Sequence, residues 1–327
     1  MNIYWGILLC ICLSACNKQS HPNTPEVVEQ AIRMFPTSVA STRALISETE
    51  DLRKEGFIVY GYKQTPTTGA QVFDHQEVTY NGIWEYSPTR YWDIAASYYF
   101  GAYSPQSIAA AHNGTGKGTH TLTIEAPYWQ VADGDETDIV VATSHDTAEN
   151  YLALGNGTVD LHFEHILSLL EIQFVHDPLL MNEYRLHRVA YKNVPIADAT
   201  SSYTLDYTAP TNSAMSVIEI LEAADSIKVT DTDEGIAVMA EVTEAATCKH
   251  LVVPFGTNSP TGIQITILYS VNGAKRYGVV NTNLQRLEAG KRYVLKLVFN
   301  SGATIIPTIY IGDWIDEDVD ENDKYNW

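Results

Sequence analysis

Residues 77–86 read Glu-Val-Thr-Tyr-Asn-Gly-Ile-Trp-Glu-Tyr, and this stretch decides the fold class. Asn81-Gly82 is a strong hairpin signal, because these residue types tolerate the positive φ angles that a tight turn between two strands requires. β-branched and aromatic residues flank the pair on both sides. The stretch therefore predicts two adjacent strands, at residues 77–80 and 82–86.

The same pattern continues in both directions from this hairpin. Short apolar, β-branched or aromatic runs alternate with Gly-, Asn- and Pro-containing turns, and Asn272-Gly273 marks a second hairpin. Helical periodicity is weak: residues 165–170 are the best short helical candidate, and residues 46–56 are predicted as a loop with a short helical turn. Many short strands at regular spacing predict an all-β fold of two β-sandwich domains, divided near Gly157 into residues 44–157 and 158–327. The predicted strands outside the first hairpin are residues 31–39, 56–62, 91–103, 120–125, 139–142, 159–165, 171–176, 184–191, 202–207, 214–218, 226–229, 237–242, 251–253, 263–271, 275–280, 292–299 and 304–311.

The N-terminus has the composition of an export signal. Residues 3–15 are an apolar run that is shorter than the about 20 residues a membrane-spanning helix needs. Leu-Ser-Ala-Cys at residues 13–16 resembles the lipobox of bacterial lipoproteins. We therefore expect a signal peptide at residues 1–15 and lipidation at Cys16, followed by a polar tether and a first strand within residues 16–43. Acyl chains on Cys16 would hold the protein on a membrane, without a transmembrane helix.

Charge and cysteine content exclude several classes of protein. The chain carries 20 Lys and Arg against 40 Asp and Glu, a formal net charge of -20, which argues against binding to nucleic acid. Of its four cysteines, Cys10 and Cys12 leave with the signal peptide and Cys16 takes lipid. Cys248 is then without a disulfide partner, and we expect it to be a small buried apolar residue.

Several segments, taken in order, are similar to one family. These segments are Thr42-Arg43-Ala44, the Tyr-rich run 57–62, Trp84-Glu85-Tyr86, Arg90-Tyr91-Trp92, residues 98–105 (YYFGAYSP), residues 138–142 (DIVVA), residues 161–165 (LHFEH), residues 251–254 (LVVP), residues 290–293 (GKRY) and residues 309–314 (IYIGDW). Their order and spacing resemble the fimbrillin superfamily of Bacteroidales, the subunits of type V pili and their relatives. The resemblance covers essentially the whole chain, although each motif alone is weak.

The resemblance implies two transthyretin-like β-sandwich domains and assembly by strand exchange. In pilus-forming members the lipoprotein reaches the outer membrane, and an Arg-specific protease cuts after an early Arg. The first strand leaves, and a strand of a neighbouring subunit takes its place. Arg43 is the expected cut site, with Arg33 and Arg53 as competitors. The C-terminal strand is the expected donor, through Ile305, Ile309, Ile311 and Trp314, and an acidic run follows it at residues 313–323. The implied partners are other fimbrillin subunits, the outer membrane through the lipid anchor, and a host or bacterial surface receptor.

Catalytic chemistry has little support in the sequence, and we expect no catalytic residue, metal or cofactor. Gly116-Lys117 lacks the remainder of a phosphate-binding loop, and Ser144-His145-Asp146 are neighbours that cannot form a relay. His162 and His165 lie on opposite faces of a strand, so they cannot share a metal; we interpret His165 as a packed or hydrogen-bonded residue.

One alternative function remains open, that of a glycan-binding outer-membrane lipoprotein. Dense aromatic side chains could form a sugar-binding face, although the sandwich core is the favoured interpretation. These side chains are Trp84, Tyr86, Trp92, Tyr98, Tyr99 and Tyr103.

Overall fold

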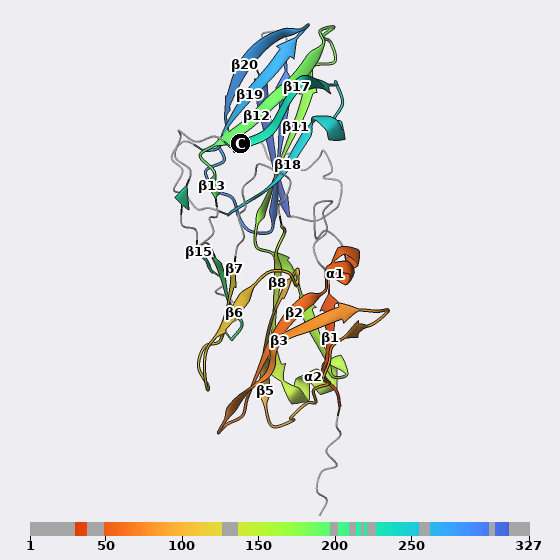
Figure 1. The fold of residues 1–327 in the computed structure, drawn as a ribbon, viewed down its shortest axis with the longest axis vertical. Coiled ribbons are helices and arrows are strands. Elements are labelled where there is room, and N and C mark those ends of the chain that lie inside the picture. The colour runs from red at the N-terminus through yellow and green to blue at the C-terminus, as the bar shows by residue number, and fades with distance from the viewer. Residues whose placement is uncertain are drawn as a thin grey trace, which may run out of the picture.

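The protein is built almost entirely from β-strands in the computed structural model, which describes residues 30–37, 49–125, 137–196, 202–208, 214–216, 219–220, 227–254, 262–300 and 305–313. Figure 1 shows the strands in two bodies along the long axis, with the N-terminal half at one end and the C-terminal half at the other. The predicted all-β fold class is confirmed. Within these ranges, no helix has the length and apolar character needed to cross a bilayer.

A six-stranded sheet forms the centre of the N-terminal half. Its order is β10 (Glu164–His165), β8 (Val140–Thr147), β5 (Ser97–Ser104), β2 (Phe57–Gln64), β3 (Gly69–Tyr80) and β4 (Trp84–Glu85). Alternate side chains of a strand point to opposite faces of its sheet. In β2, Phe57 and Val59 enter one core, whereas Ile58 and Tyr60 enter another. The sheet is therefore buried on both faces at its central strand β2.

One face of the central sheet is covered by the first strand of the chain. β1 (Arg33–Thr37) pairs in parallel with β9 (Thr158–His162), and α2 (Ala148–Gly155) lies beside β9. Ile32, Met34 and Val159 are buried in the same core as Phe57 of the central sheet. α1 (Thr49–Glu55) adds Leu52 to this core.

The opposite face is covered by a four-stranded sheet that draws on both halves of the chain. Its order is β15 (Ala214–Ser216), β14 (Ser202–Asp206), β7 (Thr121–Glu125) and β6 (Ala110–Asn113). The strands β14 and β7 are antiparallel, with Tyr203 opposite Ile124 and Leu205 opposite Leu122. The chain thus returns from the C-terminal half to complete the N-terminal one.

The C-terminal half is a sandwich of two four-stranded sheets. One has the order β18 (Thr247–Val252), β11 (Ser168–His176), β21 (Lys291–Phe299) and β22 (Ile305–Asp313). The other has the order β17 (Ile227–Val238), β12 (Tyr184–Lys192), β19 (Gln264–Val271) and β20 (Ala274–Asn281). The core between them includes Leu186, Leu295 and the predicted buried Cys248. A small sheet of β13 (Pro195–Ile196) and β16 (Glu219–Ile220) and the turn η1 (Glu244–Ala246) complete the elements.

Both predicted hairpins are confirmed. β3 and β4 pair around a turn in which Gly82 has φ 84°, and β19 and β20 pair around Asn272 (φ 49°) and Gly273 (φ 82°). A positive φ at both central residues is the backbone of a type I′ turn, which suits the Asn-Gly pair.

Helical structure differs from the expectation in two places. Residues 165–170, the best helical candidate in the sequence, lie in β10, a bend and β11, while the helix α2 forms at a segment without a predicted element. The Thr147 side chain caps α2 by accepting a hydrogen bond from the backbone of Asn150 (3.2 Å), which satisfies an N–H that the first helical turn leaves unpaired.

Candidate functional site at the first strand

The first strand is inserted into the core of the N-terminal half. Ile32 and Met34 are 1% and 3% exposed, whereas Phe35, which follows Met34 and precedes Pro36, is 50% exposed. This alternation follows from the two faces of a strand, one of which meets the core. Full burial of an Ile or Met side chain contributes about 2 kcal/mol. The strand is thus an integral layer of the domain and not a dangling N-terminal segment.

The backbone of β1 is paired with β9 on one edge. Arg33 N–H donates to Gly157 O at 3.0 Å, and residues 33–37 run in register with residues 158–162. Because N–H and C=O groups alternate between the two edges of a strand, those of Met34 and Pro36 face away from β9. Pro36 has no N–H, and it occupies a position where the β9 ladder does not require one.

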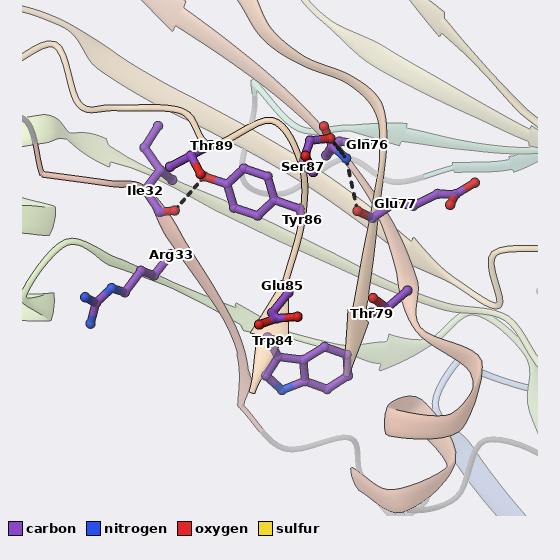
Figure 2. A pocket seen from close by; sticks show the side chains of 10 residues that line it. All are labelled: Ile32, Arg33, Gln76, Glu77, Thr79, Trp84, Glu85, Tyr86, Ser87 and Thr89. Atoms are coloured by element: carbon purple, nitrogen blue, oxygen red, sulfur yellow. Dashed lines mark hydrogen bonds between the residues drawn. The ribbon is translucent and has the colours of Figure 1, made fainter. Parts of the chain in front are cut away.

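A group of hydrogen bonds, which we call the clasp, holds the beginning of β1 on its other side. The Tyr86 hydroxyl donates to Ile32 O at 2.6 Å, as Figure 2 shows, and Ile32 N–H donates to Arg90 O at 2.8 Å. Trp92 N–H donates to Gln30 O at 3.1 Å. Burial raises the pKa of the Tyr86 hydroxyl, so this group stays a proton donor at physiological pH.

Two further contacts in the same region are made to the residues just before β9. The Trp92 indole N–H donates to Gly157 O at 3.2 Å, and Gln30 Nε2 donates to Asn156 O at 2.7 Å. Asn156 has φ 50° and Gly157 φ 77°, so both lie in the left-handed region as the chain leaves α2. The backbone between α2 and β9 therefore helps to hold the first strand in place.

A groove of about 590 Å³ lies between β1 and the β3–β4 hairpin. It is open to solvent beside the outer edge of β1, and Trp84 closes one end in the view of Figure 2. Its lining residues are Ile32, Arg33, Gln76, Glu77, Thr79, Trp84, Glu85, Tyr86, Ser87 and Thr89.

The predicted site residues fall into two groups. Cys16, Arg43 and Trp314 lie outside the described residues. Ile305, Ile309 and Ile311 lie in β22, the edge strand that pairs with β21 over nine residue pairs, from Phe299↔Ile305 to Lys291↔Asp313. These three predicted donor residues are therefore paired within their own subunit, far along the chain from β1.

The Ile305 side chain is partly buried at the edge of the C-terminal sandwich. It packs against the core, and a Cβ atom added to Gly278 of β20 would lie 2.7 Å from Ile305 Cδ1. A side chain at position 278 would collide with Ile305, and glycine avoids this collision. The start of β22 thus closes the gap between the two sheets of the sandwich.

The two competing cut sites, Arg33 and Arg53, lie in regular secondary structure and not in a loop. Arg33 is exposed but lies within β1, and Arg53 lies in α1 with its guanidinium 4.8 Å from the centre of the Tyr80 ring. Both are held by secondary structure. β1 would have to separate from β9, and α1 would have to unwind, before a protease could bind either segment as an extended substrate.

Most of the dense aromatic residues belong to the core. Trp92, Tyr98 and Tyr103 are at most 4% exposed, and Trp84 packs against Phe57 with ring centres 5.2 Å apart. The described surface therefore carries no continuous face made from the six aromatic residues named in the sequence. This arrangement favours the interpretation of these residues as sandwich core over a sugar-binding face.

Two histidines confirm their predicted separation. His162 is exposed, whereas His165 is 3% exposed with Nδ1 2.9 Å from Asp138 Oδ2. The expectation that His165 is packed or hydrogen-bonded is confirmed. Over the described ranges, no cluster of three His, Cys, Asp or Glu side chains is arranged to hold a metal ion.

Sequence reasoning missed the residues that hold β1 in place. Tyr86 and Trp92 appeared only as members of aromatic motifs, and β9 was assigned to the C-terminal domain. The alternation of Val159 and Leu161, both buried, matches that of Ile32 and Met34, but a pairing across more than a hundred residues leaves no local signal.

Comparison with known proteins shows the family of the chain and supports its fold. The model of the family described as fimbrillin-like matches residues 42–314, whereas no curated protein matches the chain. A fimbrial protein from Bacteroides vulgatus is 16% identical with a TM-score of 0.56, and the match covers 87% of this chain and 99% of that one. A candidate cell adhesion protein from Bacteroides uniformis is 16% identical with a TM-score of 0.54, covering 88% and 99%. At this identity the two structures show a shared fold, and the family match shows that the chain belongs to the fimbrillin-like family.

Proposed function

We propose that the protein is a structural or accessory subunit of a surface pilus, with a role in adhesion, and that it is assembled by protease-triggered strand exchange. Membership of the fimbrillin-like family supports the pilus role. The observation that carries the exchange mechanism is the position of β1: an edge strand whose Ile32 and Met34 fill the core. We propose no catalytic activity, in keeping with membership of the fimbrillin-like family.

Loss of β1 would leave a slot with defined requirements. Val159 and Leu161 on β9 would lose their apolar cover, and the β9 backbone would lose its partner. An exposed strand edge beside an apolar groove pairs readily with another chain. The incoming strand must be extended and parallel to β9, with apolar side chains at alternate positions, and backbone hydrogen bonds would supply affinity.

β22 offers a pattern of this kind. Ile305, Pro307, Ile309 and Ile311 alternate along it, and the sequence continues to Trp314. In the isolated subunit β22 is paired with β21. Donation to a neighbour therefore requires that β22 leave its own sheet or is extended by the segment that follows it. As an edge strand, β22 has one neighbour in the described sheet, so its departure breaks one ladder and not two.

The membrane anchor and the cut site complete the proposal. Lipid on Cys16 would hold the precursor on the outer membrane, with the polar segment after it as a tether. Cleavage after Arg43 would separate β1, which remains with the lipid, from the body that begins before α1. The partners would be other fimbrillin subunits and a host or bacterial surface receptor.

Proteolysis of the purified precursor tests the proposal. Treatment with an Arg-specific protease should yield ladders of heat-resistant oligomers on a detergent gel, and Arg43→Ala should remain monomeric. Arg33→Ala is the matched control and should polymerise like the wild type. Oligomers from Arg43→Ala would place the cut elsewhere. A wild-type protein that loses β1 and remains monomeric would refute assembly by strand exchange.

A further inference from the structure

Two histidines from one hairpin meet beneath the four-stranded covering sheet. His112 lies on β6 and His120 immediately precedes β7, with His112 Nε2 2.9 Å from His120 Nδ1. The two ring planes are nearly parallel, 2° apart, and the ring centres are 5.2 Å apart. His120 is 1% exposed and His112 is half-buried. The two imidazoles thus share one hydrogen bond away from bulk water.

A backbone carbonyl fixes which nitrogen carries each proton. His120 Nε2 lies 3.2 Å from Gly116 O, and a carbonyl can only accept a hydrogen bond. Nε2 of His120 is therefore the protonated nitrogen, and its Nδ1 accepts the hydrogen bond that His112 Nε2 donates. Two charged rings would each place an N–H in this 2.9 Å contact, so the pair can take up at most one proton while the contact is intact.

Groups from four parts of the chain surround the pair: β2, β3, the loop between β6 and β7, and the end of β14 with the residues that follow it. From β2, the Tyr62 ring stacks on His120 at 3.7 Å and the Tyr60 ring stacks on His112 at 6.0 Å. From β3, His75 Nδ1 lies 3.0 Å from the Tyr60 hydroxyl, and Asp74 favours a charged His112.

The remaining neighbours lie on the loop and on the segment after β14. The Lys117 amine is bound to Pro66 O, Tyr207 lies 6.1 Å from both imidazoles, and the Asp206 carboxylate accepts hydrogen bonds from Thr208. Burial and the neighbouring His120 oppose a proton on His112 more strongly than Asp74 favours it, so the pKa of His112 lies below its usual value.

His120 also joins the two halves of the chain. Its backbone N–H donates to Thr208 Oγ1 at 3.1 Å, and its carbonyl accepts from Tyr207 N–H at 3.2 Å. Residues 207–208 directly follow β14, the strand that the C-terminal half contributes to this sheet. A displacement of His120 would therefore loosen the connection between β7 and β14.

We propose that the His112–His120 pair is a protonation-sensitive lock on the covering sheet, closed at neutral pH and opened by mild acid. A histidine whose pKa is lower in the closed state binds protons more readily once the sheet opens. The stabilisation is complete above the unperturbed histidine pKa of about 6.5 and is lost as the pH falls below that value. Opening would uncover Leu122 and Leu205 on the inner side of the sheet.

Hydrogen exchange of the intact chain tests the lock, with rates corrected for the intrinsic effect of pH. Amides of residues 110–125 and 202–208 should exchange up to about tenfold faster, relative to residues 264–281, at about pH 5.5 than at about pH 7.5, because an opening that takes up one proton is favoured by up to tenfold per pH unit below the free histidine pKa of about 6.5. His112→Gln keeps an amide donor but does not titrate, and it should remove most of this difference. His145→Gln, at an exposed histidine stacked on Tyr99, is the control and should behave like the wild type.

Two results would overturn the lock. One is equal corrected exchange of residues 110–125 at the two pH values in the wild type. The other is a full wild-type pH dependence in His112→Gln. A titration of the histidine rings by NMR gives an independent readout, in which His112 should titrate below the unperturbed histidine pKa of about 6.5.

Discussion

At the scale of single residues, the Tyr86 hydroxyl is the contact whose loss should most selectively free the first strand. It donates to Ile32 O at 2.6 Å within the clasp. We expect Tyr86→Phe to lower the free energy of unfolding by about 1.5 kcal/mol, because a buried carbonyl loses its donor. Hydrogen exchange of residues 30–37 should rise more than that of the C-terminal sandwich. Tyr103→Phe, which removes a hydroxyl bonded to Ile108 O at 3.0 Å, is the matched control and should leave residues 30–37 protected.

At the scale of elements, the two faces of β1 should respond differently to truncation. Met34 is 3% exposed and Phe35 is 50% exposed, so adjacent residues report on the core and on solvent. We expect Met34→Ala to cost about 3 kcal/mol in urea unfolding, from lost burial and the cavity left behind. Phe35→Ala should cost less than about 1 kcal/mol, as surface substitutions generally do. Equal losses for the two variants would show that β1 is not seated in the core in solution.

The same elements show how far the sequence predicts this fold. Asn81-Gly82 and Asn272-Gly273 identify hairpins because turn chemistry is local, and alternation identifies residues 31–39 as a strand. The pairing of β1 with β9, and of β7 with β14, joins segments that are far apart in sequence. A single sequence records that each strand has an apolar face, but not which of the many apolar faces it meets. The sequence therefore predicts the first strand, but not the residues that hold it in place.

At the scale of the whole molecule, the covering sheet should make the two halves unfold together. β14 of the C-terminal half pairs with β7, and the core beneath this sheet also contains Leu169 and Leu251 from the C-terminal sandwich. Shared strands and a shared core couple the two bodies, although each has a core of its own. We therefore expect a single calorimetric transition at neutral pH, with calorimetric and van't Hoff enthalpies that agree.

Leu205→Ala tests this coupling on one strand of the shared sheet. Leu205 is 2% exposed, so the substitution should cost about 3 kcal/mol and separate the transition into two, because it weakens the layer that joins the halves. Thr204→Ala changes the neighbouring side chain on the opposite face of β14 and should leave one transition. Two transitions in the wild type would mean that the halves unfold independently. A single transition in Leu205→Ala at a lower temperature would mean that contacts outside the covering sheet are sufficient to couple them.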